Sequence, residues 1–178
     1  MDVAMGLPES HSLHRMFRGL TESTFLDELG IGDPGLVGYV SGLLARFVAA
    51  SALWSIRDAS GTRLTEVAHM LLEAESTDDL DRRRECHQHV GDYALFWTGV
   101  YPEALARKRP PGSVDGLINF QRQGKHSYYV ASTLDGERAP VLRRLSDEFE
   151  LCAFGLSRVR REWERHEGRP HRGPLLAG

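Results

Sequence analysis

Apolar residues recur at intervals of three and four along almost the whole chain, and this spacing restricts the fold more than any other feature of the sequence. An α-helix has about 3.6 residues per turn, so side chains three and four positions apart lie on one face. No segment of the sequence shows the strict alternation that is typical of a β-strand. The sequence therefore predicts an all-α fold, a single-domain bundle of five to seven helices. The clearest run comprises Leu142, Leu145, Phe149, Cys152, Leu156, Val159 and Trp163, and we call it the 142–163 seam.

Capping residues place the starts of the predicted helices. Asp33 can accept hydrogen bonds from free backbone amides, and Pro34 needs no amide of its own at the first helical position. The segment 76–79, Ser-Thr-Asp-Asp, is a similar start signal with acids in the first turn. Ser113 or Asp115 caps a later helix. We expect helices over about 13–20, 25–29, 34–56, 62–75, 78–98, 113–134 and 140–163, with the 34–56 helix at the hydrophobic centre.

A chain of 178 residues suits one domain, which can bury a sufficient core without a metal ion or a disulfide. Residues 10–168 carry the helical pattern and form the predicted domain. We expect residues 1–9 to be a flexible N-terminus. Residues 169–178 contain two prolines and two glycines and are predicted to be a disordered tail.

Charge and cysteine content describe an ordinary soluble protein. The chain has 22 basic and 25 acidic residues, a formal net charge of −3, so we do not expect a nucleic-acid partner. Two cysteines are too few for a disulfide framework and favour a reducing compartment. The first residues show neither the basic nor the apolar region of an export signal. We therefore expect a bacterial cytoplasmic protein.

One apolar stretch, from Leu36 to Ile56, is long enough to raise the question of a membrane span. Arg46 lies at its centre, where a charge costs about 2.5–3.5 kcal/mol on insertion scales. Gly and Ser are also scattered through the stretch. We interpret it as a buried helix and expect no membrane association.

A cluster of potential metal ligands follows residue 84. The segment 85–89 is Glu-Cys-His-Gln-His, but two histidines two positions apart on a helix point about 200° apart and cannot share one ion. Four-helix bundles hold two iron or manganese ions with paired Glu-x-x-His motifs, and this chain has one such motif, at 66–69. Ordinary helix-surface pairs are the simpler interpretation, so no cofactor is predicted. The alternative is an iron or manganese site with the ligands Glu66, His69, Glu85, His89 and Asp92.

A basic segment provides a candidate anion-binding site. Residues 105–130 carry five basic residues and one acidic residue, and Tyr128 and Tyr129 lie near the end of the same segment. Cations of this kind can bind a phosphate or an acidic peptide, and a base could stack on the tyrosines. The competing interpretation is a solvated loop whose tyrosines belong to the core. The candidate residues are Arg107, Lys108, Arg109, Arg122, Lys125 and His126.

Nucleophilic catalysis has little support in the sequence. Cys86 and Cys152 occupy positions typical of small core residues. The chain has no Gly-x-Ser-x-Gly elbow, no phosphate-binding glycine-rich loop and no Cys-x-x-Cys pair. The sequence therefore names no catalytic residue.

The run Tyr-Ala-Leu-Phe-Trp-Thr-Gly-Val-Tyr-Pro-Glu at 93–103, together with Gly-Lys-His-Ser-Tyr at 124–128, resembles segments of bacterial helical proteins that carry no assigned activity. The resemblance spans about residues 25–135 and is sharpest from Asp92 to Glu103. It implies an all-α fold and brings no catalytic residues with it.

Three hypotheses for function follow. The first is a non-catalytic helical bundle that acts through contacts with another protein or with itself, as a homodimer, or by binding a small ligand. The 142–163 seam either packs within one chain or forms a two-fold dimer interface, and apolar spacing alone does not distinguish the two. The alternative is a metal- or haem-dependent helical enzyme that uses Glu66, His69, Glu85 and His89. The third is a phosphate- or RNA-binding module centred on residues 107–109, whose affinity falls steeply with salt.

Overall fold

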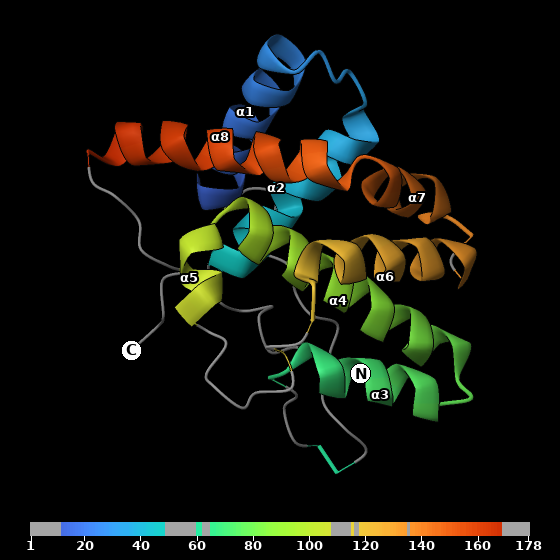
Figure 1. The fold of residues 1–178 in the computed structure, drawn as a ribbon. Coiled ribbons are helices and arrows are strands. Elements are labelled where there is room, and N and C mark those ends of the chain that lie inside the picture. The colour runs from blue at the N-terminus through green and yellow to red at the C-terminus, as the bar shows by residue number, and fades with distance from the viewer. Residues whose placement is uncertain are drawn as a thin grey trace.

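The computed structural model describes residues 12–48, 60–61, 65–107, 115, 118–134 and 136–168. All regular structure within these residues is helical, which confirms the all-α prediction (Figure 1). The predicted flexible N-terminus and disordered tail lie outside the described residues, as does the predicted helix beyond residue 48. The helices are α1 (Ser12–Glu22), the π-helix η1 (Ser23–Glu28), α2 (Pro34–Val48), α3 (Val67–Ser76), α4 (Leu80–Gly99), α5 (Pro102–Arg107), α6 (Phe120–Leu134), α7 (Ala139–Asp147) and α8 (Phe149–Glu167).

Two helix starts lie where the capping residues predicted them. The Asp33 carboxylate accepts hydrogen bonds from the backbone amides of Gly35 and Leu36 at 2.9 and 3.2 Å, at the start of α2. The Asp79 carboxylate accepts one from the Asp81 amide at 2.9 Å, at the start of α4. These contacts satisfy amides that have no partner within their helix.

The predicted cap at Asp115 has a different role. Its carboxylate accepts hydrogen bonds from the amides of Val67 and Ala68 at 2.9 and 3.0 Å, so it caps α3 from a distant part of the chain. The later helix, α6, begins at Phe120 instead, and Asn119 caps it by accepting from the Arg122 amide at 2.9 Å. The prediction that Ser113 or Asp115 starts this helix is wrong for Asp115, and Ser113 lies outside the described residues.

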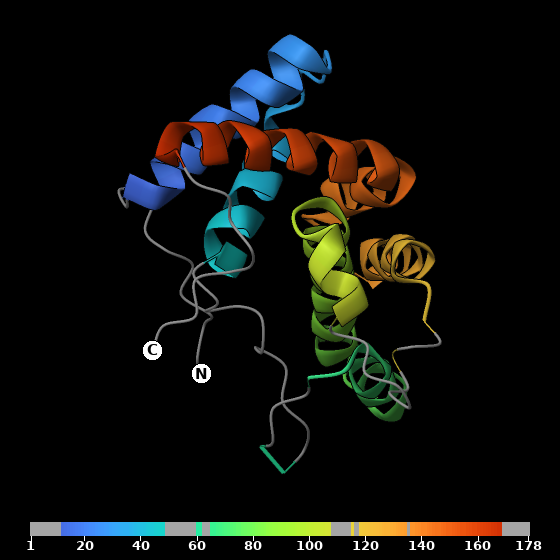
Figure 2. The same cartoon turned by 60° about the vertical axis from the view of Figure 1, so that its left-hand side comes forward.

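Helix α4 occupies the centre of the described structure. It packs against α2, α3, α5, α6 and α8, and Figures 1 and 2 show these helices arranged around it. We expected the 34–56 segment at the centre, but α2 packs against α1, α7 and α4. The difference arises because aromatic side chains and small residues in the second half of α4 let it be buried on several sides at once.

The spacing between α4 and α6 is set by glycines on both helices. A Cβ atom added at Gly91 would lie 2.6 Å from the ring of Tyr128. One added at Gly124 would lie 2.6 Å from the Phe149 ring and 2.8 Å from the Ala94 Cβ. Since real Cβ atoms do not approach so closely, only glycine permits this packing.

The 142–163 seam is buried within one chain. All seven of its side chains are at most 1% exposed, and Trp163 packs edge-on against Phe17 of α1 with ring centroids 5.0 Å apart. We predicted one continuous helix, but the backbone departs from helical geometry at Glu148 (φ −109°, ψ 26°), which separates α7 from α8. The change of direction keeps both apolar faces on the core. A dimer would therefore need a surface other than this seam.

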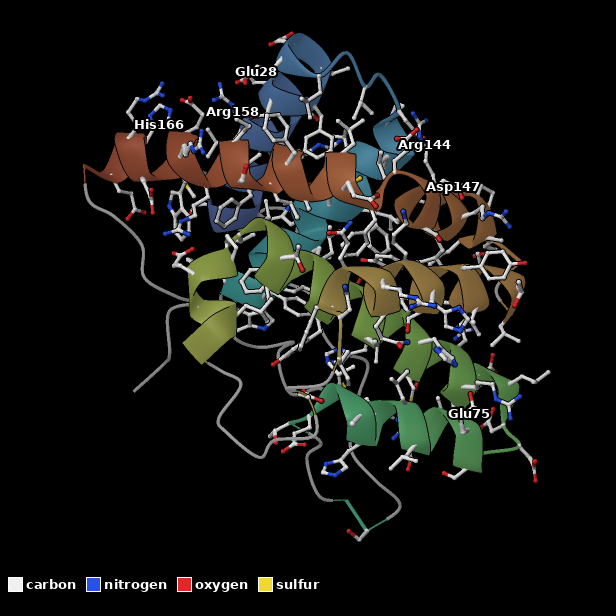
Figure 3. The ribbon with its side chains drawn as sticks, in the orientation of Figure 1. Glu28, Glu75, Arg144, Asp147, Arg158 and His166 are labelled. Carbon is white, nitrogen blue, oxygen red and sulfur yellow. The ribbon has the colours of Figure 1, made fainter. Side chains whose placement is uncertain are left out.

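Ion pairs connect the outer helices. Arg158 of α8 lies 2.8 Å from Glu28 of η1, and Arg144 of α7 lies 2.7 Å from Asp33 (Figure 3). Among the described residues, no helix has both the length and the apolar character needed to cross a bilayer.

The glycine packing predicts a large effect of one methyl group. We expect Gly124→Ala to lower the free energy of unfolding by about 1–3 kcal/mol, since α6 must move away from Phe149 and Ala94. Gly19→Ala is the control, because Gly19 also lies within a helix but has open space around it, so we expect no loss and a gain of up to about 1 kcal/mol. Equal stability of the two variants in urea unfolding would contradict this packing.

Candidate functional site

A hollow of about 520 Å³ opens on the surface beside the first turns of α6 and α8. Its lining comes from three helices, α6, α7 and α8, and from the residue that caps α6. The volume is in the range that binds small organic ligands. The lining residues are Asn119, Gln121, Arg122, Lys125, His126, Tyr129, Ser146 and Glu150.

Helix α6 supplies the basic side chains of this hollow. Arg122, Lys125, His126 and Tyr129 are three to four residues apart and therefore share one face of the helix. The opposite face, which includes Gly124 and other buried residues, packs on the core. The amphipathic pattern of α6 thus turns three cationic or titratable groups toward solvent.

Arg122 and His126 are available to an incoming ligand. Both residues are exposed, and neither side chain has a hydrogen-bond or ion-pair partner among the described residues. An unpaired guanidinium offers two parallel N–H donors, a geometry suited to a carboxylate or phosphate. This pair is the part of the hollow most suited to an anion.

Lys125 already holds an anionic group. Its Nζ lies 2.7 Å from Oε1 of Glu150, and Gln121 Nε2 donates a hydrogen bond to the same oxygen at 2.9 Å. The Lys125 hydrogen bond lowers the pKa of the Glu150 carboxyl, which keeps that group charged. A carboxylate from the chain itself therefore sits where a ligand anion could bind.

Two neighbouring tyrosines have opposite roles. The Tyr129 ring is 43% exposed, lines the hollow and carries the Arg143 guanidinium 4.6 Å from its centroid. Tyr128 is fully buried and donates a hydrogen bond to Asp92 Oδ1 at 2.7 Å. Only Tyr129 is therefore placed to stack against a ligand.

The predicted anion-binding residues fall into two groups. Arg122, Lys125 and His126 come together in the hollow. Arg107 is the last residue of α5, but its side chain is not described, and Lys108 and Arg109 lie outside the described residues. The structure therefore brings together the three candidate residues on α6 and does not describe the side chains of the other three.

Asp92 is the most deeply buried acid in the described structure. Its Oδ1 accepts hydrogen bonds from the hydroxyls of Tyr39 and Tyr128, both at 2.7 Å, and its Oδ2 lies 3.4 Å from Arg46 Nη2. Gln88 Nε2 donates to the Tyr39 hydroxyl at 2.9 Å. Burial raises the pKa of Asp92, and Arg46 and the two phenols oppose that rise. Burial also raises the pKa values of both tyrosines, so they remain hydrogen-bond donors.

The five metal-ligand candidates of the alternative hypothesis lie in different surroundings. His89 is buried with its ring stacked on Phe47 at 5.9 Å, whereas Glu85 is exposed and pairs with Arg82. His69 lies exposed on α3, which begins after its N-cap residue Glu66. The fifth candidate, Asp92, is held by phenols. The described part of the chain contains no group of three or more His, Cys, Asp or Glu side chains that could hold a metal ion.

Both cysteines pack in the core, in agreement with their sequence positions. Burial raises the pKa of Cys86 to about 11 and that of Cys152 to about 12. A thiol is a poor nucleophile while it stays protonated. Neither residue has the environment of a reactive cysteine.

His87 is not among the candidate metal ligands, because it and His89 are two positions apart on a helix and cannot share one ion. It is 4% exposed, and its Nε2 lies 4.0 Å from Glu75 of α3, which is labelled in Figure 3. Burial lowers its pKa, and Glu75 only partly offsets this effect. His87 and His89 have different neighbours, as expected for residues two apart on a helix.

No family model, curated protein or solved structure matches this chain.

The buried His87 predicts a component of the pH dependence of stability. Its folded-state pKa lies below the unfolded value of about 6.5, so stability is present above that pH and is lost as the pH falls toward the folded pKa. One proton accounts for at most about 1.4 kcal/mol per pH unit. We expect His87→Gln to lose less stability than the wild type between pH 7 and 5 in urea unfolding. His69→Gln, at an exposed histidine, should retain the wild-type slope; identical slopes in all three proteins would contradict the assignment.

Proposed function

We propose that this chain is a non-catalytic protein that binds a small anionic ligand in the hollow beside α6. The observation that carries the proposal is the convergence of Arg122, Lys125 and His126 on one exposed face of α6. Two of these side chains have no partner among the described residues, and the third pairs with Glu150. A phosphate or a carboxylate is the group that such side chains bind best.

Helix dipoles add to the attraction. The first turns of α6 and α8 both border the hollow, since Asn119, Gln121 and Arg122 come from the start of α6 and Glu150 from the start of α8. The N-terminal end of a helix carries partial positive charge and favours anions. The two helix starts and the basic side chains therefore both favour an anion at this place, in a chain whose formal net charge is −3.

The lining supports binding rather than chemistry on the ligand. Besides the three basic residues it offers amide groups from Asn119 and Gln121. The Ser146 hydroxyl donates to the Lys125 carbonyl oxygen at 2.7 Å, so it fastens α7 to α6. These groups hold and orient a ligand, and the small-ligand form of the sequence hypothesis is the one they favour.

The positions of Arg122 and Lys125 in the hollow predict that replacing either residue weakens the binding of phosphate. We expect inorganic phosphate, added during NMR titration, to shift amide signals at the start of α6 and α8. Arg122→Gln and Lys125→Gln should each weaken phosphate binding about tenfold, because each removes a charge-assisted hydrogen bond of about 1.5 kcal/mol. Binding should also weaken at high salt.

Arg15→Gln is the control for the general loss of positive charge, because Arg15 is exposed on α1, a helix that contributes nothing to the hollow. We expect this variant to bind phosphate like the wild type. The proposal fails if phosphate does not saturate these shifts, or if Arg122→Gln and Arg15→Gln behave alike.

A further inference from the structure

We propose that the ligand joins a phosphate to a planar ring, the chemistry of a mononucleotide, and that the ring stacks on Tyr129. This inference rests on the proposed function and identifies the class of ligand. It follows from the Tyr129 side chain, from the spacing along α6 and from the charged groups around the hollow.

The exposed Tyr129 ring offers a surface on which a planar ring of a ligand can stack. One side of it is covered by the Arg143 guanidinium, 4.6 Å from the centroid, yet 43% of the residue is still exposed. Tyr129 lines the hollow, whereas Arg143 does not. The cation holds the ring in place, and the remaining aromatic surface can pack against a base.

The spacing along α6 fits a two-part ligand. Tyr129 follows Lys125 by four residues, about 6 Å along the helix axis, and both line the hollow. This separation is comparable to that between the phosphate and the base of a nucleotide, which a ribose bridges.

The Glu150 carboxylate occupies the position that we assign to the phosphate. Its Oε1 accepts both the Lys125 and the Gln121 hydrogen bonds, so it occupies the position of one phosphate oxygen. Half of the Glu150 side chain is exposed, and it can move toward solvent when a phosphate takes its place. Arg122 and His126 then contact the other phosphate oxygens.

The surroundings favour a single nucleotide over a nucleic-acid strand. Asp147 at the end of α7 is 62% exposed, and Glu148 and Glu150 follow within three residues. These carboxylates pair with Arg143, Arg144 and Lys125, so the surface beside the hollow carries charges of both signs and no continuous basic track. A strand would also need a longer basic surface, because its affinity depends on several phosphate contacts.

The test compares adenosine monophosphate, inorganic phosphate and adenosine by NMR titration of the full chain. We expect adenosine monophosphate to bind at least tenfold more tightly than either of the other two. Tyr129→Leu should lower the affinity for adenosine monophosphate to about that of inorganic phosphate. Tyr129→Phe retains the ring and should retain the advantage of adenosine monophosphate.

The outcomes separate this inference from the proposed function. If phosphate binds but adenosine monophosphate binds no tighter, the ring-stacking inference is overturned and the anion site stands. If adenosine binds as tightly as its monophosphate, or no anion binds, the proposed function itself fails. An oligonucleotide that binds far more tightly than the mononucleotide would overturn the assignment to a single nucleotide.

Discussion

The arrangement of the helices depends on one buried carboxylate, that of Asp92. Asp92 of α4 is buried, and a buried carboxylate costs several kcal/mol unless its oxygens find partners. Those partners come from two other helices, Tyr39 and Arg46 from α2 and Tyr128 from α6. One side chain therefore links both α2 and α6 to α4 through hydrogen bonds and an ion pair.

The rotation of α6 links this buried cluster to the surface. Since Tyr128 points inward to Asp92, the adjacent face that bears Arg122, Lys125 and Tyr129 points outward and lines the hollow. Gly91 and Gly124 allow α4 and α6 to pack closely, with Gly124 against Phe149. The hydrogen bond from the Ser146 hydroxyl to the Lys125 carbonyl oxygen attaches α7 to α6. Core packing thus determines which side chains a ligand meets.

Local signals predicted much of this structure, and distant contacts account for the rest. The fold class follows from apolar spacing, and the caps at Asp33 and Asp79 act within their own helices. The prediction for Asp115 is wrong because its carboxylate caps α3, through the amides of Ala68 and Val67, which lie 47 and 48 residues earlier in the chain. The basic residues of the hollow were predicted because they share one segment, whereas Ser146 and Glu150 reach it only through tertiary packing. Asp92 suggested a metal ligand because its phenol partners are 53 and 36 residues away.

A double-mutant cycle between Asp92 and Tyr128 tests the central interaction most directly. The free energies of unfolding of Asp92→Ala, Tyr128→Phe and the double variant would be compared with that of the wild type. The account predicts that the double variant is more stable than the sum of the single effects implies, by about 1 kcal/mol or more, since each single change already removes the shared hydrogen bond. Additivity within about 0.3–0.5 kcal/mol would mean that this pair does not couple α4 to α6, and would contradict the account.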